Sequence, residues 1–200
     1  MRNFLFSRRP QILGTMVAGL GLALLSGAPA QAALINTDAC DNATLSQPFA
    51  AYGDTAQYKL VPGGSFTGTS TTWTLSHGAR VVAGGPSGSS LYLSAGASAQ
   101  SPFTCVDAAD PTFRFFGRND GLLSTFLVQV VYNEPLLGPV ALPVGVFALS
   151  GSWQPSATML TASVVQGLLS NGTAQVAIRF TELTGASQMD NVFVDPRMHW

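Results

Sequence analysis

Two carboxylates near the end of the chain are the residues best suited to chemistry. Asp190 and Asp195 flank the run Val192-Phe193-Val194 in "GASQMDNVFVDPR", residues 185–197. A glycosidase pair needs carboxylates about 5 to 9.5 Å apart, whereas residues five apart on one extended strand are separated by about 16 Å. These two therefore cannot form such a pair with each other. Asp190 is predicted to cap the strand start or to bind backbone amides, and Asp195 to end the strand in a turn.

The rest of the sequence contains no recognisable set of catalytic residues either. His77 and His199 have no cysteine or acidic companions at zinc-ligand spacing, and no Gly-x-Ser-x-Gly elbow is present. Lys59 lies outside any Gly-Lys-Ser/Thr sequence, which excludes a phosphate-binding loop. We therefore predict a protein that is not an enzyme and has no catalytic residues. A hydrolase stays an alternative only if a cleft gathers distant carboxylates such as Glu134 and Glu182.

The N-terminus has the three-part order of a secretory signal. Arg2, Arg8 and Arg9 precede an apolar run, and small residues then offer an Ala-x-Ala cleavage site at residues 30–32. The apolar run is too short to span a membrane, which takes about 20 residues. We predict a cleaved signal peptide over residues 1–32 and a secreted, extracellular protein with no membrane span after cleavage.

The mature chain is mildly acidic. Residues 1–32 hold three of the nine basic residues and none of the ten acidic ones, so cleavage leaves a formal charge of −4. This charge argues against nucleic acid or anionic lipid as the main partner. One lysine against eight arginines, with many Ala and Gly residues, suggests GC-rich coding DNA and a bacterial source.

Residues 33–200 are long enough for one domain with one core. They contain Cys40 and Cys105, which we predict to form a disulfide in an oxidising compartment. Chain-entropy arguments give such a bridge about 4 kcal/mol. The competing interpretation, a catalytic thiol, lacks a nearby histidine to activate it. Residues 33–62 either pair as strands or wrap the domain as an extension held by this bridge.

The mature chain alternates in short runs with a period of two and shows no sustained helical period. Gly, Pro, Asn and Ser separate these runs, and Asn119-Asp120-Gly121 and Asn171-Gly172 are hairpin signals. Residues 135–156, with several prolines and glycines, leave room for an edge strand or a long loop. The fold class is therefore all-β, an antiparallel sandwich. We predict strands within residues 72–82, 89–96, 111–118, 124–132, 158–165, 173–183 and 190–196.

Alternation assigns faces to two of these strands. In residues 173–183 it places Ala174, Val176, Ile178 and Phe180 toward the core, and Gln175, Ala177, Arg179 and Thr181 toward water or a ligand. In residues 111–118 it places Phe113 and Phe115 inward, and Arg114 and Phe116 outward.

The order of these runs resembles the galactose-binding-like and carbohydrate-binding-module type of jelly-roll sandwich. Gly63-Gly64-Ser65-Phe66, Trp73 and Asp190-Asn191-Val192 match the opening, the tryptophan and the closing strand of that family, over about residues 63–196. The chain is also similar to uncharacterised exported actinobacterial proteins. The resemblance implies a jelly roll and, in many of these modules, a buried structural calcium. Its ligands are an acidic residue after the opening Phe, nearby carbonyls and the closing-strand Asp. Asp190 matches the last of these, but Thr67 stands where the acidic residue belongs.

Sugar-binding surfaces combine aromatic rings with a few fixed polar groups. The ring-bearing candidates are Trp73, Trp153, Tyr92, Tyr132 and Phe116, and the outward arginines Arg114 and Arg179 could hold an acidic group. For each of these residues a place in the core or on a solvated sheet face is the alternative. The resemblance thus implies a secreted, non-catalytic module that binds an extracellular carbohydrate or cell-envelope component. The alternative is a structural or protein-interaction protein of the cell surface without a small ligand.

Overall fold

The computed structural model describes residues 44–68, 71–107, 112–121, 123–134, 136–160 and 173–195. The chain divides between Ala32 and Ala33 into two units, and every described residue lies in the second. Apart from one short 3-10 helix, η1 (Ala50–Tyr52), the regular structure described is all strand. Within these residues we find no helix long and apolar enough to cross a membrane.

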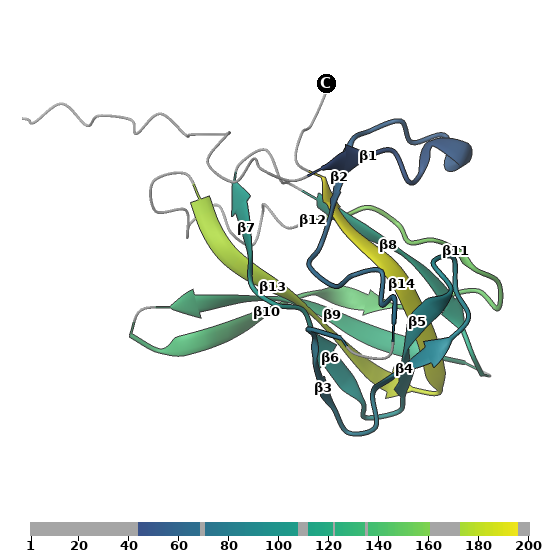
Figure 1. Ribbon diagram of the computed structural model, residues 1–200. Helices are drawn as coiled ribbons and strands as arrows, with labels where there is room; N and C mark the ends of the chain where they lie inside the picture. The colour runs from purple at the N-terminus through teal and green to yellow at the C-terminus, as the bar shows by residue number, and fades with distance from the viewer. Residues whose placement is uncertain are drawn as a thin grey trace, which may run out of the picture. The chain divides into compact units, whose positions relative to one another are not determined.

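The described strands form two antiparallel sheets (Figure 1). The eight-stranded sheet contains β1 (Leu45–Ser46), β2 (Tyr58–Leu60), β4 (Arg80–Ala83), β5 (Ser89–Ser94), β8 (Thr112–Asn119), β11 (Gln154–Pro155), β12 (Met159–Leu160) and β14 (Ala186–Asp195). The six-stranded sheet contains β3 (Thr74–Ser76), β6 (Ser98–Gln100), β7 (Thr104–Asp107), β9 (Thr125–Glu134), β10 (Gly138–Phe147) and β13 (Thr173–Thr184).

The core fills the space between the two sheets. The eight-stranded sheet contributes side chains from β5, β8 and β14, and the six-stranded sheet contributes side chains from β6, β9 and β13. Because successive residues of a strand point to opposite faces, each strand turns every second side chain toward the core, although some outward residues are buried as well. One of these is Ala177, predicted to face water or a ligand but fully buried. On β13 the core-facing side chains are Val176, Ile178 and Phe180, with Ala174 packed beside them, as the alternation predicted. The prediction of an all-β antiparallel sandwich is confirmed.

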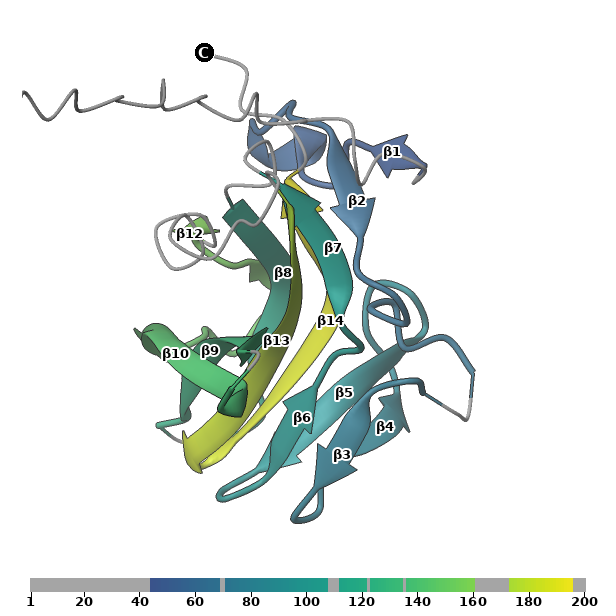
Figure 2. The ribbon, with the colours of Figure 1, turned by 90° about the vertical axis from the view of Figure 1, so that its left-hand side faces the viewer.

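β14 is the central strand of the eight-stranded sheet. It pairs with β8 along one side and with β5 and then β2 along the other. Its predecessor β13 belongs to the other sheet, so the chain changes layers at Gly185 (Figure 2). A glycine is required there because its φ is +72° and an added Cβ would lie 3.0 Å from Ser124 Cα.

Several strand predictions need correction. Residues 72–82 are two strands in different sheets, because His77 and Gly78 take positive φ values and turn the chain. Asn119-Asp120-Gly121 is not a hairpin but the connection from β8 to β9, in the other sheet. The Asn171-Gly172 signal and residues 161–165 lie outside the described residues. The short strands β6 and β7 were not predicted.

Two segments left open by the sequence are now assigned. Within residues 135–156, β10 is an edge strand that pairs with β9 alone among the described residues. Its Pro139 and Pro143 lack the N–H groups that another strand would need, which protects this edge from further pairing. Within residues 44–62, β1 and β2 join the eight-stranded sheet.

Candidate ligand-binding site

Four polar or aromatic side chains form a row across the outer face of the eight-stranded sheet. Strand register places Arg118 opposite Gln188, Gln188 opposite Tyr92, and Tyr92 opposite Arg80. All four point away from the core, because their strand neighbours Leu91 and Met189, among others, are buried inside it. With neighbouring strands about 4.8 Å apart, this cross-strand row is about 14 Å long.

The middle of the row contains a ring beside a fixed amide. The Arg80 guanidinium carbon lies 4.0 Å from the centroid of the Tyr92 ring, in a cation–π arrangement. Gln188 is only 5% exposed, and its Oε1 accepts a hydrogen bond of 2.9 Å from Ser90 Oγ. This bond fixes the orientation of the amide, which is what a polar group for ligand selection requires.

The Arg118 end of the row meets a tryptophan. The Arg118 guanidinium carbon lies 5.6 Å from the centroid of the half-buried Trp153 ring. Its Nη2 donates to Asp120 Oδ1 at 2.9 Å, whereas its buried Nε has no hydrogen-bond partner within the described part of the chain. Trp153, predicted as a loop aromatic, is thus placed beside the row.

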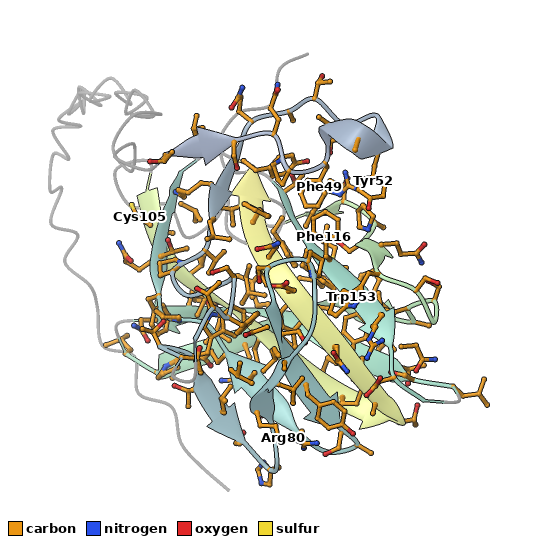
Figure 3. All side chains as sticks on the ribbon, turned by 45° about the vertical axis from the view of Figure 1, so that its right-hand side comes forward. Phe49, Tyr52, Arg80, Cys105, Phe116 and Trp153 are labelled. Atoms are coloured by element: carbon orange, nitrogen blue, oxygen red, sulfur yellow. The ribbon has the colours of Figure 1, made fainter. Side chains whose placement is uncertain are left out.

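Another part of this sheet face, around Phe116 and Phe193, is covered by residues 47–57, which we call the strap. Phe49 of the strap is fully buried and stacks on Phe116, with ring centroids 5.1 Å apart. It also makes edge contacts with Tyr58 at 4.9 Å and Phe193 at 5.7 Å. Figure 3 shows Phe49, Tyr52 and Phe116 grouped together, with Trp153 next to them and Arg80 farther along. Phe116 does point outward, as predicted, but the strap covers it and leaves it 7% exposed.

Arg114 holds the strap in place rather than facing a ligand. Its Nη1 pairs with Asp54 Oδ2, its Nε and Nη2 donate to Ser156 O, and its guanidinium lies 4.5 Å from the Phe49 ring. Burial alone would raise the pKa of Asp54. Hydrogen bonds from Tyr58, the Ala56 amide and Arg114 outweigh that effect, so the pKa lies below its ordinary value.

A β-bulge divides the covered half of the face from the open half. The register of β14 against β8 shifts between Asp190 and Phe193, and Asn191 takes a φ of 51°. The extra residue reverses the alternation, so Val192 enters the main core while Phe193 joins the aromatic cluster under the strap. The row with Gln188 lies on the open side of this bulge.

Asp190 is fully buried beside the row and ties β14 to the loop between β4 and β5. Its Oδ2 accepts from the Ser87 amide at 2.8 Å, and its Oδ1 accepts from the Asn191 amide at 2.7 Å. Burial raises the pKa of Asp190, although these amides and the Ser87 hydroxyl act to lower it. Asp190 therefore binds backbone amides, as predicted, but it lies in the middle of β14 rather than at the start of the strand.

The calcium site implied by the resemblance does not fit these residues. The Ser87 hydroxyl fills the space between the Asp190 oxygens and nearby carbonyls where the ion would lie. Thr67, which stands where an acidic ligand is expected, is exposed. Calcium requires six to eight oxygen ligands with several carboxylates among them. Among the described residues, no three His, Cys, Asp or Glu side chains gather as they would around a metal ion.

Three predicted binding residues are placed elsewhere. Trp73 is a core residue, 4% exposed, with its ring 5.9 Å from Phe180 and its Nε1 bonded to Pro62 O, so it has no face for a ligand. Tyr132 is half-buried on β9 of the six-stranded sheet and packs against the core. Arg179 donates to Gln100 Oε1 on that same sheet.

Arg114 and Arg179 cannot hold one acidic group together, because they lie on the outer faces of different sheets. The predicted disulfide stays a prediction, since Cys105 lies on β7 but Cys40 is outside the described residues.

The hydrolase alternative gains no support from the two carboxylates named for it. Glu182 is 1% exposed, and its carboxyl accepts hydrogen bonds from Ser124 Oγ and Ser187 Oγ. Burial raises its pKa, although the two hydroxyls act to lower it. The side chain of Glu134 lies outside the described part of the chain.

Sequence reasoning did not identify Arg80, Arg118 or Gln188 as site residues. Alternation within one strand says which face a side chain takes, but only the pairing of β8, β14, β5 and β4 brings these residues into one row. The outward position of Arg118, two residues after Phe116, was the available signal.

No protein-family model matches the chain, and no curated protein is similar to it. The similar solved structures include carbohydrate-binding modules. One is the module pair CBM22-1 and GH10 of xylanase 10B from Clostridium thermocellum with xylohexaose, at 15% identity and a TM-score of 0.48. That match covers 70% of this chain and 27% of that chain, so it spans about a quarter of the xylanase structure.

Another is the CBM22-1 xylan-binding domain of Xyn10C from Paenibacillus barcinonensis, at 11% identity and a TM-score of 0.48, covering 72% of this chain and 97% of that chain. A third is the family 11 carbohydrate-binding module of the Clostridium thermocellum cellulase Lic26A-Cel5E, at 12% identity and a TM-score of 0.40, covering 68% and 93%. At these identities the likeness concerns the β-sandwich alone.

Proposed function

We propose that this protein is exported and binds an extracellular or cell-envelope carbohydrate, without catalysis, on the open half of the eight-stranded sheet. The observation that carries this proposal is the row Arg118, Gln188, Tyr92 and Arg80, with Trp153 at its side. It joins rings that can stack on the apolar face of a sugar to planar polar groups that can pair with hydroxyls.

Each member of the row has a distinct task in this proposal. Tyr92 supplies the central ring, and the exposed Arg80, which now lies over that ring, moves aside and binds sugar oxygens. Gln188, 5% exposed, is oriented by Ser90, so that the small accessible part of its amide offers hydrogen bonds in a fixed direction. Guanidinium groups at both ends of the row suit the oxygens of hydroxyl or carboxylate substituents.

The proposal is tested by screening the protein against glycans and cell-wall polysaccharides. Wild-type protein should bind at least one class of polysaccharide, and Tyr92→Ala should lower the affinity about tenfold, the effect expected for a central interface residue. Arg179→Ala, on the outer face of the other sheet, is the matched control and should bind normally. Equal affinities for the two variants would place the site elsewhere, and no binding to any glycan would reject the proposal.

A second function, protein interaction at the cell surface, is favoured by one observation. The connection between β9 and β10 exposes Leu136 and Leu137 by 92% and 79%. Two adjacent leucine side chains this exposed offer an apolar surface on which a protein partner could dock. If glycans do not bind, loss of cell-surface attachment in the Leu136→Ser, Leu137→Ser double variant, with attachment kept in Leu123→Ser, would support this function.

A further inference from the structure

The Ser87 hydroxyl lies at the centre of a group of oxygens contributed by three segments of the chain. It is 2.6 Å from Ser65 O, 2.7 Å from Asp190 Oδ1, 2.8 Å from Asp190 Oδ2 and 3.3 Å from Ser89 O. A hydroxyl carries one proton, so it cannot donate fully to all four acceptors. Backbone carbonyls and a carboxylate are the kinds of ligand that bind calcium, but this group offers four oxygens where calcium takes six to eight.

These oxygens correspond to the calcium ligands that the resemblance implied. Ser65 belongs to the opening Gly-Gly-Ser-Phe stretch and Asp190 to the closing strand. Calcium binds its oxygens at about 2.3 to 2.6 Å. An ion at the centre of this group would occupy the space that Ser87 Oγ now fills. The backbone at Gly85 also packs closely against the Asp190 carboxylate, since an added Cβ there would lie 2.9 Å from Asp190 Oδ2.

We infer that in this chain the Ser87 hydroxyl replaces the structural calcium, so that the fold and its binding face form without a metal ion. Ser87 binds the Asp190 carboxylate with both its amide and its hydroxyl, as a positioning residue. The Asn191 amide supplies a further donor, which compensates the buried carboxylate for the water it loses.

The bond between Ser87 and Asp190 also affects the proposed binding site, because it holds β4 and β5. Ser87 lies in the loop that joins these two strands, and they carry Arg80 and Tyr92. The bond from Ser87 to Asp190 therefore fixes that hairpin against β14, where Gln188 lies. The inference itself concerns the fold and does not depend on what the row binds.

Thermal unfolding of the full protein in millimolar calcium chloride and in excess EDTA tests this inference. The melting temperature should be the same in both, and isothermal titration with calcium should show no binding. A higher melting temperature with calcium, or a lower one with EDTA, would overturn it. This arm uses the unaltered chain and needs no variant to fold.

A second arm asks whether the hydroxyl itself stabilises the loop. Ser87→Ala should lower the melting temperature by on the order of 5 °C, because it leaves buried acceptors without their donor. Ser89→Ala is the matched control, since only the backbone oxygen of Ser89 joins the group, and it should melt near the wild type. A Ser87→Ala protein that melts with the control would also overturn the inference.

Discussion

Replacing Phe49 with alanine should release the strap from the eight-stranded sheet. Phe49 is fully buried, and its ring contacts Phe116, Tyr58 and Phe193 at centroid distances of 5.1, 4.9 and 5.7 Å. Truncating a buried phenylalanine costs about 3 to 5 kcal/mol through lost burial and the cavity left behind. The Arg114 guanidinium, 4.5 Å from the centroid of the same ring, loses this cation–π contact as well. We therefore expect the free energy of unfolding to fall by about 4 kcal/mol.

Urea unfolding followed by tryptophan fluorescence measures this loss. With a denaturant slope of about 2 kcal/mol per molar, the midpoint should fall by about 2 M. Tyr52→Ala is the control within the same strap, because Tyr52 is 56% exposed and contacts Phe116 only by its edge at 5.7 Å. A change near 1 kcal/mol or less is expected for it. If Phe49→Ala cost no more than Tyr52→Ala, the strap would not be packed on this face and the division into covered and open halves would fail.

Three further predictions concern stability, association and oxidation. The buried carboxyls Glu182 and Asp190 have raised folded pKa values. The protein should therefore lose stability as the pH rises from the ordinary pKa values, 4.5 for Glu182 and 3.8 for Asp190, through the raised ones, because the unfolded chain releases the protons first. Urea midpoints of Glu182→Gln should fall less over this range, and an equal fall would contradict the assignment. Pro143→Val restores an edge N–H on β10 and should increase self-association in sedimentation velocity, whereas an unchanged profile would show that the proline does not protect this edge. Peptide maps of the exported protein with and without reductant should differ by a Cys40 to Cys105 cross-link, and free thiols at both positions would refute the bridge.

The layers and the core of this fold could be predicted from the sequence because they depend on local alternation. The inward residues of β13 and the pair Phe113 and Phe115 were assigned correctly on that basis alone. The same rule placed Phe116 outward, which is also correct. It could not show that Phe49, far away along the chain, covers that ring, because such a contact depends on tertiary packing.

Bulges and layer changes were beyond prediction for a related reason. Asn191 adds one residue to β14 and reverses the alternation that follows, and the sequence around it reads as an ordinary strand. Asn119-Asp120-Gly121 has the composition of a hairpin turn but connects two sheets. Local turn chemistry says that the chain bends there, but not which strand it pairs with next.

The residues of the candidate site were the hardest to predict from the sequence. Trp73 was named as a possible sugar platform by residue type, yet a tryptophan is as well suited to the core, where it is found. Gln188 has no distinguishing feature in the sequence. Its role follows from the register that sets it between Arg118 and Tyr92, and this pairing joins residues far apart along the chain.

The most direct test of the central claim is a calorimetric titration of the bound glycan into Gln188→Ala and Gln129→Ala. Both remove one amide from the outer face of a sheet, but Gln188 lies in the cross-strand row and Gln129 lies on β9 of the other sheet. Our account predicts that Gln188→Ala weakens binding about tenfold while Gln129→Ala binds as the wild type does. Unchanged binding in Gln188→Ala, with weakened binding in Gln129→Ala, would contradict it and move the site to the six-stranded sheet.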